Sequence, residues 1–192
     1  MMHQIETRTI AFHEMETRID DEGARHLLGV VIPWRGTYQM PNGIIESFDR
    51  GAFTKTLKEH GTEIPLYTQH ESTTTLPVGT AVAWENTSEG LIGDFKMART
   101  TAAEDVMSLA KDGHVKGLSV GFIPVRNRTE RRGEQQHVIR LEARMDHVGF
   151  VRQPAYPDAR VLAVRQYDPD DANCAPRLAR WRGTFLNQPD QI

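Results

Sequence analysis

A serine between two glycines, in the run Gly117-Leu118-Ser119-Val120-Gly121, is the feature that most restricts how this chain can fold. Small and apolar residues alternate there, which indicates a β-strand with both glycines and the serine on one face. Glycine inside a strand costs packing and backbone entropy, and it often marks a close approach by a ligand or another backbone. The segment therefore predicts a strand with a bare face around one hydroxyl. A β-bulge, or another element that crosses the strand closely, is the structural alternative.

Short alternating or apolar segments dominate the rest of the chain and predict mainly β structure. Further strands are expected at residues 5–12, 26–34, 64–68, 78–84, 91–97, 138–143 and 145–151. One helix is expected after a cap at Ser47 or Asp49 and should end at Gly61. A second should run from near Thr101 to Gly113. Many short strands with two helices predict a closed or nearly closed β-barrel with short α-helices packed outside it.

Composition limits the classes of function. The chain has 192 residues and a formal net charge of −3, and it has no apolar run near the ~18 residues that cross a membrane. We expect a soluble protein, with neither nucleic acid nor membrane as its main partner, and a solvated hairpin tip at the basic residues 126–132. The N-terminus has no signal-peptide core, so the protein should act inside a cell. The single cysteine, Cys174, fits a reducing compartment and argues against a catalytic thiol.

The composition becomes more polar from Tyr167 onward, beginning with an Asp-Pro-Asp-Asp run. We therefore expect residues 1–166 to form the folded domain and residues 167–192 a flexible tail. The alternative is a helix docked on the domain through Leu178, Trp181 and Phe185. Removing the residues after Gln166 would separate the two possibilities.

The serine motif formally fits the G-x-S-x-G elbow of α/β-hydrolases. That elbow requires a strand, a sharp turn at the serine and then a helix. Pro124 and a charged hairpin follow Ser119 instead, so this fold is not expected. The hydroxyl still needs a base, because a serine at its free pKa is a poor nucleophile.

Eight histidines compete for the role of base. His70 ends an apolar strand at a polar loop, where a side chain is rigidly held and yet accessible. His147 is expected to share one strand face with Met145 and Gly149. Either could also be a structural histidine. The remaining histidines are expected to be ordinary. A surface imidazole is the default in the polar or terminal contexts of His3, His13, His26, His60 and His137, and His114 is in a helix-to-strand turn. No metal-binding spacing of histidine or cysteine occurs, so zinc is not expected.

Four blocks of sequence follow one another in a characteristic order. The first is Ile45-Glu46-Ser47-Phe48-Asp49-Arg50-Gly51-Ala52-Phe53, and the second is Pro65-Leu66-Tyr67-Thr68-Gln69-His70-Glu71 with Pro77-Val78-Gly79 downstream. The third is the helix of residues 101–112 that leads into the serine motif and Phe122, and the fourth covers residues 147–159. Together they resemble the prohead maturation proteases of tailed bacteriophages, whose barrel is related to that of herpesvirus assemblins. The resemblance covers residues 29–164. It implies an assemblin-like barrel and a serine endopeptidase that needs no cofactor.

The resemblance implies that Ser119 is the nucleophile and His70 the general base. Where the family usually has a glutamate, this chain has His147, and the serine that follows two residues later in the family is Gly149 here. Assemblins use a histidine at the third place, so a triad of Ser119, His70 and His147 is expected. A neutral third member stabilises an imidazolium less than a carboxylate does, so the protease should be slow.

Other residues remain open for the supporting roles. Glu142 or Glu71 could be the third member if His147 is structural, whereas Asp146 should point to the opposite strand face. Oxyanion donors are also required. The backbone amides of residues 120–122, or the guanidinium groups of Arg126 or Arg152, could supply them.

The resemblance also implies partners and a location. The expected substrates are the scaffolding segment of the major capsid protein, other internal prohead proteins and the protease's own terminus, with possible self-association. The expected location is the host cytoplasm, inside assembling proheads, or a bacterium that carries a prophage. The competing hypothesis is a non-catalytic internal scaffold or assembly domain that keeps the barrel.

Overall fold

The computed structural model describes residues 6–11, 15–19, 25–69, 75–115 and 117–152. The strands are β1 Glu6–Ala11, β2 Met15–Ile19, β3 Arg25–Pro33, β4 Tyr38–Gln39, β5 Ile45–Phe48, β6 Pro65–Tyr67, β7 Gly79–Asn86, β8 Gly90–Met97, β9 Gly117–Arg132 and β10 Gln135–Val151. The helices are α1 Thr54–His60, the 3-10 turn η1 Gly61–Glu63 and α2 Thr101–Lys111. His70, Glu71, Cys174 and the expected tail at residues 167–192 lie outside the described residues.

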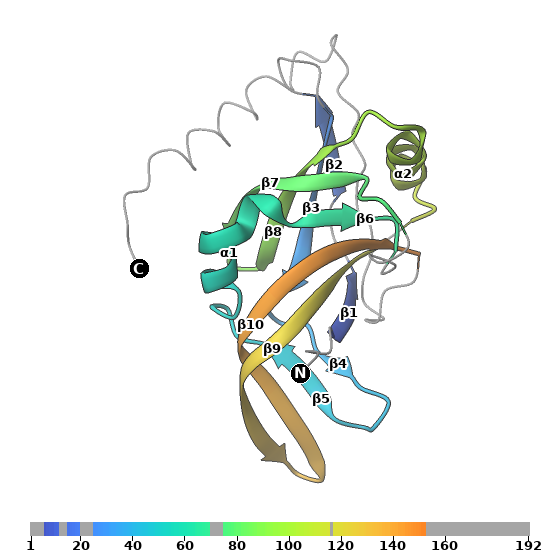
Figure 1. Cartoon of the computed structure of the whole chain (residues 1–192). Coiled ribbons are helices and arrows are strands. Elements are labelled where there is room, and N and C mark those ends of the chain that lie inside the picture. Colours follow the sequence, from blue (N-terminus) through green and yellow to red (C-terminus); the bar gives the residue numbers. More distant parts are fainter. Residues whose placement is uncertain (1–5, 12–14, 20–24, 70–74, 116, 153–192) are drawn as a thin grey trace.

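One strongly curled sheet, a half-barrel, forms the body of the molecule (Figure 1). Its strand order is β1-β9-β10-β6-β7-β8-β3-β2, and β5, which also pairs with β4, joins β10 off this path. Neighbours are antiparallel, except that β5 and β6 run parallel to β10. The predicted mainly β class with two short α-helices is therefore confirmed.

β9 and β10 form a long hairpin that projects beyond the rest of the sheet (Figure 1). The segments expected at residues 138–143 and 145–151 are parts of the single strand β10, and the strand of Ser119 continues through Pro124 to Arg132. Most of the outer part of this hairpin is exposed and polar, so it lacks the apolar alternation that reveals a strand in sequence. Gly133 forms the turn of the hairpin, with φ at 63°. The basic residues 126–132, expected at the hairpin tip, are instead the largely exposed part of β9 that leads to this turn.

Helix α2 follows the sequence prediction closely. The Thr100 hydroxyl accepts a hydrogen bond of 3.3 Å from the Ala103 N–H and so caps the helix. The expected apolar stripe is buried, and it consists of Ala103, Val106, Met107 and Ala110.

The predicted cap of the first helix is wrong. Ser47 lies inside β5, and the Asp49 carboxylate accepts a hydrogen bond from the Gly51 N–H at 3.0 Å within a turn. Helix α1 begins only at Thr54 and has no side-chain cap. The Asp49 side chain thus accepts a hydrogen bond from the backbone two residues later, as aspartate commonly does in turns. Sequence alone does not distinguish this role from helix capping.

The strands expected at residues 5–12 and 26–34 are β1 and β3, and β1 pairs with β9 while β3 lies between β2 and β8. The prediction that His26 lies at the surface is wrong. Its side chain is buried, with Nδ1 2.8 Å from the Asp94 Oδ1 atom of β8. Strand β8 is paired to β3, so this contact depends on long-range pairing.

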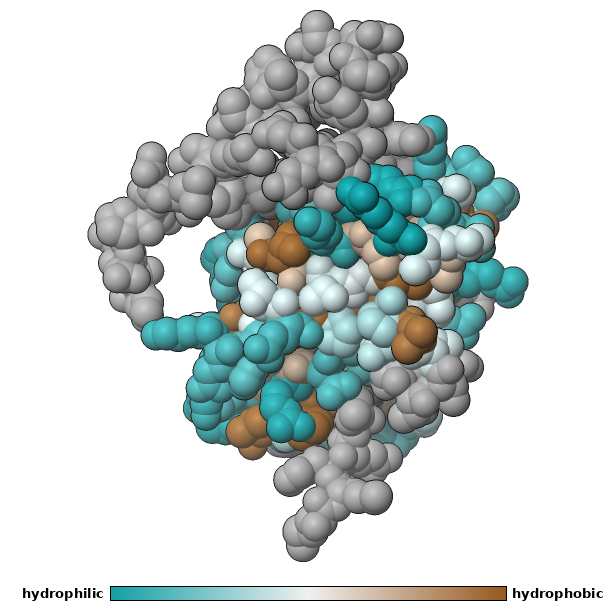
Figure 2. Space-filling view, turned by 45° about the horizontal axis from the view of Figure 1, so that its top comes forward, coloured by the Kyte–Doolittle hydropathy of each residue, from teal (hydrophilic) through white to brown (hydrophobic). Residues whose placement is uncertain are grey.

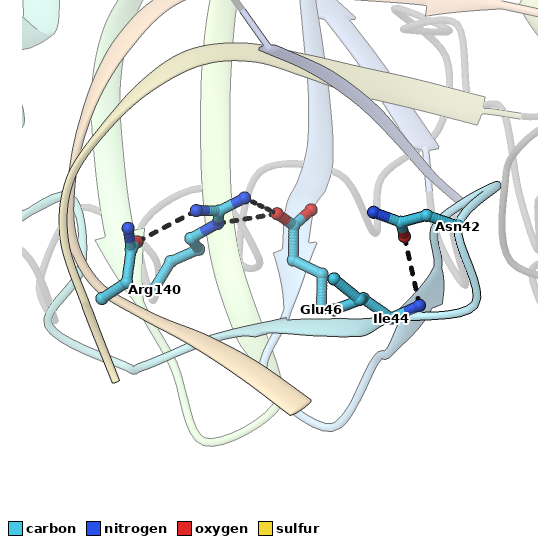
Figure 3. Close-up of polar contacts among 5 residues, drawn as sticks. Asn42, Ile44, Glu46 and Arg140 are labelled. Carbon is cyan, nitrogen blue, oxygen red and sulfur yellow. Dashed lines mark hydrogen bonds and ion pairs between the residues drawn. The ribbon is translucent and has the colours of Figure 1, made fainter. Parts of the chain in front are cut away.

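The hydrophobic core lies against one face of β9, to which Leu118, Val120 and Phe122 contribute. Phe48 of β5 packs edge-on against Phe122 at a centroid distance of 5.0 Å. β5 also brings a buried ion pair to this end of the sheet (Figure 3), in which the Arg140 Nε donates to Glu46 Oε1 at 2.7 Å. Glu46 is completely buried, so Arg140 offsets a charge that water cannot reach.

Figure 2 shows hydrophobic residues in separate small patches among hydrophilic ones on the face it presents. The exposed large hydrophobic residues include Leu76, Leu109 and Val125. Within the described residues, no helix is long and apolar enough to span a membrane.

Candidate active site

Ser119 lies inside β9, which pairs with β1 on one side and β10 on the other. Thr9 of β1 and Gly149 of β10 are its neighbours in register. Leu118 and Val120 belong to the core, so alternation places Ser119 and Gly121 on the opposite face of the strand. The strand continues past Ser119 and no helix follows, which excludes the hydrolase elbow.

His147 of β10 lies opposite Gly121, while Gly149 lies opposite Ser119. Ser119 and His147 are therefore diagonal neighbours on one face of adjacent strands, an arrangement within reach of long side chains. A Cβ atom at Gly121 would lie 2.2 Å from the Cε1 atom of His147 and 2.6 Å from both ring nitrogens. A close approach therefore occurs at Gly121, as the glycines suggested, but the approaching group is an imidazole side chain and not a ligand or another backbone.

A β-bulge separates His147 from Met145. Met145 pairs with Phe122 and His147 pairs with Gly121, so Asp146 is an extra residue on β10. Met145 consequently lies in the core, and the expectation that it shares a face with His147 is wrong. The expectation that Asp146 points away is also wrong, because its Oδ2 atom is 2.9 Å from Nδ1 of His147.

The contact with His147 determines the protonation state of Asp146. The hydrogen bond from His147 holds the pKa of Asp146 below its ordinary value, partial burial opposes this, and the charges of His147 and Arg144 lower it further. Asp146 is therefore ionised at neutral pH and can only accept a hydrogen bond. It follows that Nδ1 of His147 carries a proton and donates it to Asp146.

The His147 ring is held by its surroundings as well. Its side chain is 2% exposed, and the Tyr67 ring of β6 packs edge-on against it at a centroid distance of 5.7 Å. Tyr67 pairs with Gly149, and Gly149 pairs with Ser119, so Tyr67 stands in the same row of the sheet as the serine. The end of β6 therefore lies beside the candidate site, separated from Ser119 only by β10.

His70 follows β6 by three residues, so its own position lies outside the described part of the chain. The residue before it is strained. Gln69 has φ at 147°, and it is the one non-glycine residue with positive φ in the part of the backbone that the structure describes. Such conformations cluster at functional sites and persist only where the surrounding structure imposes them.

Comparison with known protein families identifies the family to which the chain belongs. The sequence matches that of the caudovirus prohead serine proteases over residues 13–171. The chain belongs to this family. The resemblance seen in the sequence blocks is therefore confirmed.

The fold agrees with this family. The bacteriophage T4 capsid assembly protease, gp21, superimposes with a TM-score of 0.56, which covers 77% of this chain and 97% of gp21. Sequence identity is 9%, so this similarity concerns the fold alone. None of the curated proteins compared with the chain matches it significantly.

Several residues that the sequence offered for supporting roles do not lie at the candidate site. Glu142 lies five residues before His147 on β10, which is about 16 Å along a strand, and its Oε2 atom is 3.8 Å from Arg126 Nε. Arg126 is largely exposed and lies about 23 Å along β9 from Ser119. Arg152 is exposed beyond the end of β10. The amides of residues 120–122 belong to a strand that is paired on both sides.

A pocket of about 410 Å³ lies elsewhere, between α1 and strand β7. Trp34, Trp84 and Phe53 line it, together with Arg50, which donates to Asn86 at 3.0 Å. Neither Ser119 nor His147 lines it, so this pocket lies apart from the candidate site. Among the residues with assigned positions, no cluster of three or more metal-ligating side chains occurs.

Proposed function

We propose that this protein is the endopeptidase of phage capsid maturation, with Ser119 as nucleophile, His70 as general base and His147 as third triad member. The observation that carries the proposal is the diagonal placement of Ser119 and His147 on one sheet face in a member of the prohead serine protease family. Gly121 supports it, because the bare backbone there makes room for the His147 ring.

Chain geometry supports His70 as the base. Tyr67 is two strands away from Ser119 in the same row, which corresponds to about 10 Å. Three residues span at most about 10 Å, so a side chain at position 70 can reach the space beside the hydroxyl. The strained backbone at Gln69 favours a constrained, functional position for the residue that follows it.

The reaction is acyl transfer. The Ser119 Oγ attacks the carbonyl carbon of a peptide bond while its proton passes to His70. The C–N bond breaks, and His70 gives the proton to the leaving amine. A water molecule then attacks the serine ester and gives its proton to His70. The C–O bond to Ser119 breaks, and the proton returns to the serine oxygen. The second product leaves as a carboxylic acid.

Ser119 has no exposed surface. A peptide carbonyl can meet the hydroxyl only if the groups that cover the site move apart. Cleavage is therefore proposed to follow an opening of the site, as in proteins whose substrate entry requires a conformational step.

The proposed substrates follow from the family. They are the scaffolding segment of the major capsid protein, other internal prohead proteins and the protease's own terminus. The place of action is inside the assembling prohead, in the host cytoplasm.

Co-expression with the capsid protein tests the proposal. The wild type should process the capsid protein, whereas Ser119→Ala should yield assembled, uncleaved proheads, because this change removes one hydroxyl and little packing. Ser108→Ala, which removes an exposed hydroxyl from α2, is the matched control and should process normally. Normal cleavage by Ser119→Ala with no other protease present contradicts the proposal. Failure of the wild type to cleave would favour the non-catalytic scaffold instead.

A further inference from the structure

A carboxylate lies directly behind the proposed third triad member. The Asp146 Oδ2 atom is 2.9 Å from Nδ1 of His147. A histidine in the third place offers a dipole, where a carboxylate offers a full charge to the imidazolium that forms during catalysis. In this chain the carboxylate of Asp146, the residue before His147, supplies the negative charge that His147 lacks.

We propose that Asp146 is a positioning residue for proteolysis, which holds the proton of His147 on Nδ1 so that Nε2 can accept a hydrogen bond from His70. This inference rests on the proposed function, in which His147 contacts His70. Asp146 also places a negative charge behind the two imidazoles. It touches neither substrate nor nucleophile, and it acts through His147.

The chemistry requires one tautomer of His147. A neutral imidazole has one N–H donor and one nitrogen acceptor, and the hydrogen bond made by one nitrogen decides the role of the other. An ionised carboxylate beside Nδ1 accepts that proton and leaves Nε2 as the acceptor. When His70 takes the proton of Ser119, the charge of Asp146 stabilises the resulting imidazolium, and no proton needs to reach Asp146 itself.

The bulge in β10 brings the Asp146 side chain to His147. In a regular strand the side chain of residue 146 would point to the face opposite His147. The extra residue between the pairs of Met145 and His147 breaks that alternation, and bulges often re-aim side chains next to active sites. Tyr67 and the backbone of Gly121 hold the ring, so its Nδ1 edge stays turned toward Asp146.

Loss of the Asp146 charge is expected to have a moderate effect on the reaction rate. The Asp146 side chain is 32% exposed, so water screens part of its charge, and the nearby Arg144 opposes it. Removing the charge should therefore slow the reaction without abolishing it. By analogy with the carboxylate partners that orient metal-bound histidines, the loss should be about tenfold to a hundredfold.

The rate at which a fluorophosphonate probe labels Ser119 in the full-length protein tests this proposal. Asp146→Asn should lower the rate by about tenfold or more, and Asp146→Glu, which keeps the charge, should fall between Asn and the wild type. Asp105→Asn removes an exposed carboxylate from α2 and should leave the rate unchanged. An Asp146→Asn rate within about twofold of the wild type, or equal losses in the Asn and Glu variants, would overturn the proposal.

A double-mutant cycle with His147→Glu, which introduces the glutamate that the family usually carries, is a second test. In the His147→Glu background the third member has its own charge, so Asp146→Asn should change the rate by less than about twofold. An undiminished loss in that background would mean that Asp146 acts on the fold or on another group, which contradicts the proposal.

The third readout needs no variant. The ¹⁵N chemical shifts of the His147 imidazole in the wild type should show the proton on Nδ1, and a proton on Nε2 alone contradicts the inference. These results also separate the two proposals. If the wild type is not labelled at Ser119 even in assembled proheads, the proposed function fails and this inference falls with it. If labelling requires Ser119 and His70 but is indifferent to Asp146, only the inference fails.

Discussion

The imidazole of His147 lies against the backbone of Gly121, at a distance that excludes any side chain there. A Cβ atom on residue 121 would come within 2.2 Å of Cε1 of the ring. The ring has little freedom to withdraw, because it is buried, bonded to Asp146 and packed against Tyr67. The two residues therefore depend on each other across the β9–β10 pair.

Gly121→Ala should displace the His147 ring and lower both stability and activity. Forcing a methyl group into a packed site costs about 1–3 kcal/mol, which a thermal or urea unfolding curve can measure. Gly51→Ala is the control, because its nearest contact would be an ordinary 3.5 Å. Full stability and full activity of Gly121→Ala would show that His147 is not fixed as described.

The Asp146 contact should stabilise the fold in a pH-dependent way. His147 holds the pKa of Asp146 below its ordinary value, so the stabilisation is complete above about pH 4 and is lost as pH falls through the lowered folded value. The free energies of unfolding of the wild type and Asp146→Asn, measured in urea, should therefore differ most near neutral pH and become equal in acid. A difference that stays constant down to the acid limit would argue against an ionic contribution from this contact.

The buried pair of Glu46 and Arg140 should be essential to stability. Glu46→Leu leaves the Arg140 charge without its carboxylate and should cost about 3–5 kcal/mol. The double variant Glu46→Leu with Arg140→Met removes both charges and should recover much of this loss. Glu130→Gln, on the exposed hairpin, is the control and should change the free energy of unfolding little, because water screens its ion pair with Arg128. If the double variant were no more stable than Glu46→Leu, the cost would not come from an uncompensated charge.

If His70 is the base, the cleavage rate should fall as pH decreases through an imidazole pKa near ~6.5. His70→Ala should lower the rate by about 10²- to 10⁴-fold, the usual contribution of a general base. His114→Ala and His137→Ala are the controls, since the first residue is exposed and the second is only partly buried. Equal losses in all three variants would indicate a folding defect and leave no dedicated base.

Local signals in the sequence predict much of this structure. The strand around Ser119 and the apolar stripe of α2 follow from sequence, because alternation and helical spacing are properties of short segments. The close approach at Gly121 follows as well, because a glycine inside a strand leaves room that a neighbouring group can fill.

Features that depend on pairing between distant segments are not predictable in this way. The period-two rule places Asp146 on the wrong face, because it assumes a regular strand and only the register against β9 reveals the extra residue. Sequence context places His26 at the surface, because its partner Asp94 is 68 residues away. The length of the β9–β10 hairpin escapes prediction for a similar reason, since its outer part is held by pairing and not by apolar burial.

Mass-spectrometric mapping of a serine-directed fluorophosphonate adduct tests the central claim most directly. The full-length protein, alone and in proheads formed with the capsid protein, is treated with the probe and digested, and the modified peptide is sequenced. We predict one adduct on the Oγ atom of Ser119, which is lost in His70→Ala because the hydroxyl then has no base. Absence of an adduct on Ser119 even in assembled particles, or labelling of another serine in its place, would contradict the account.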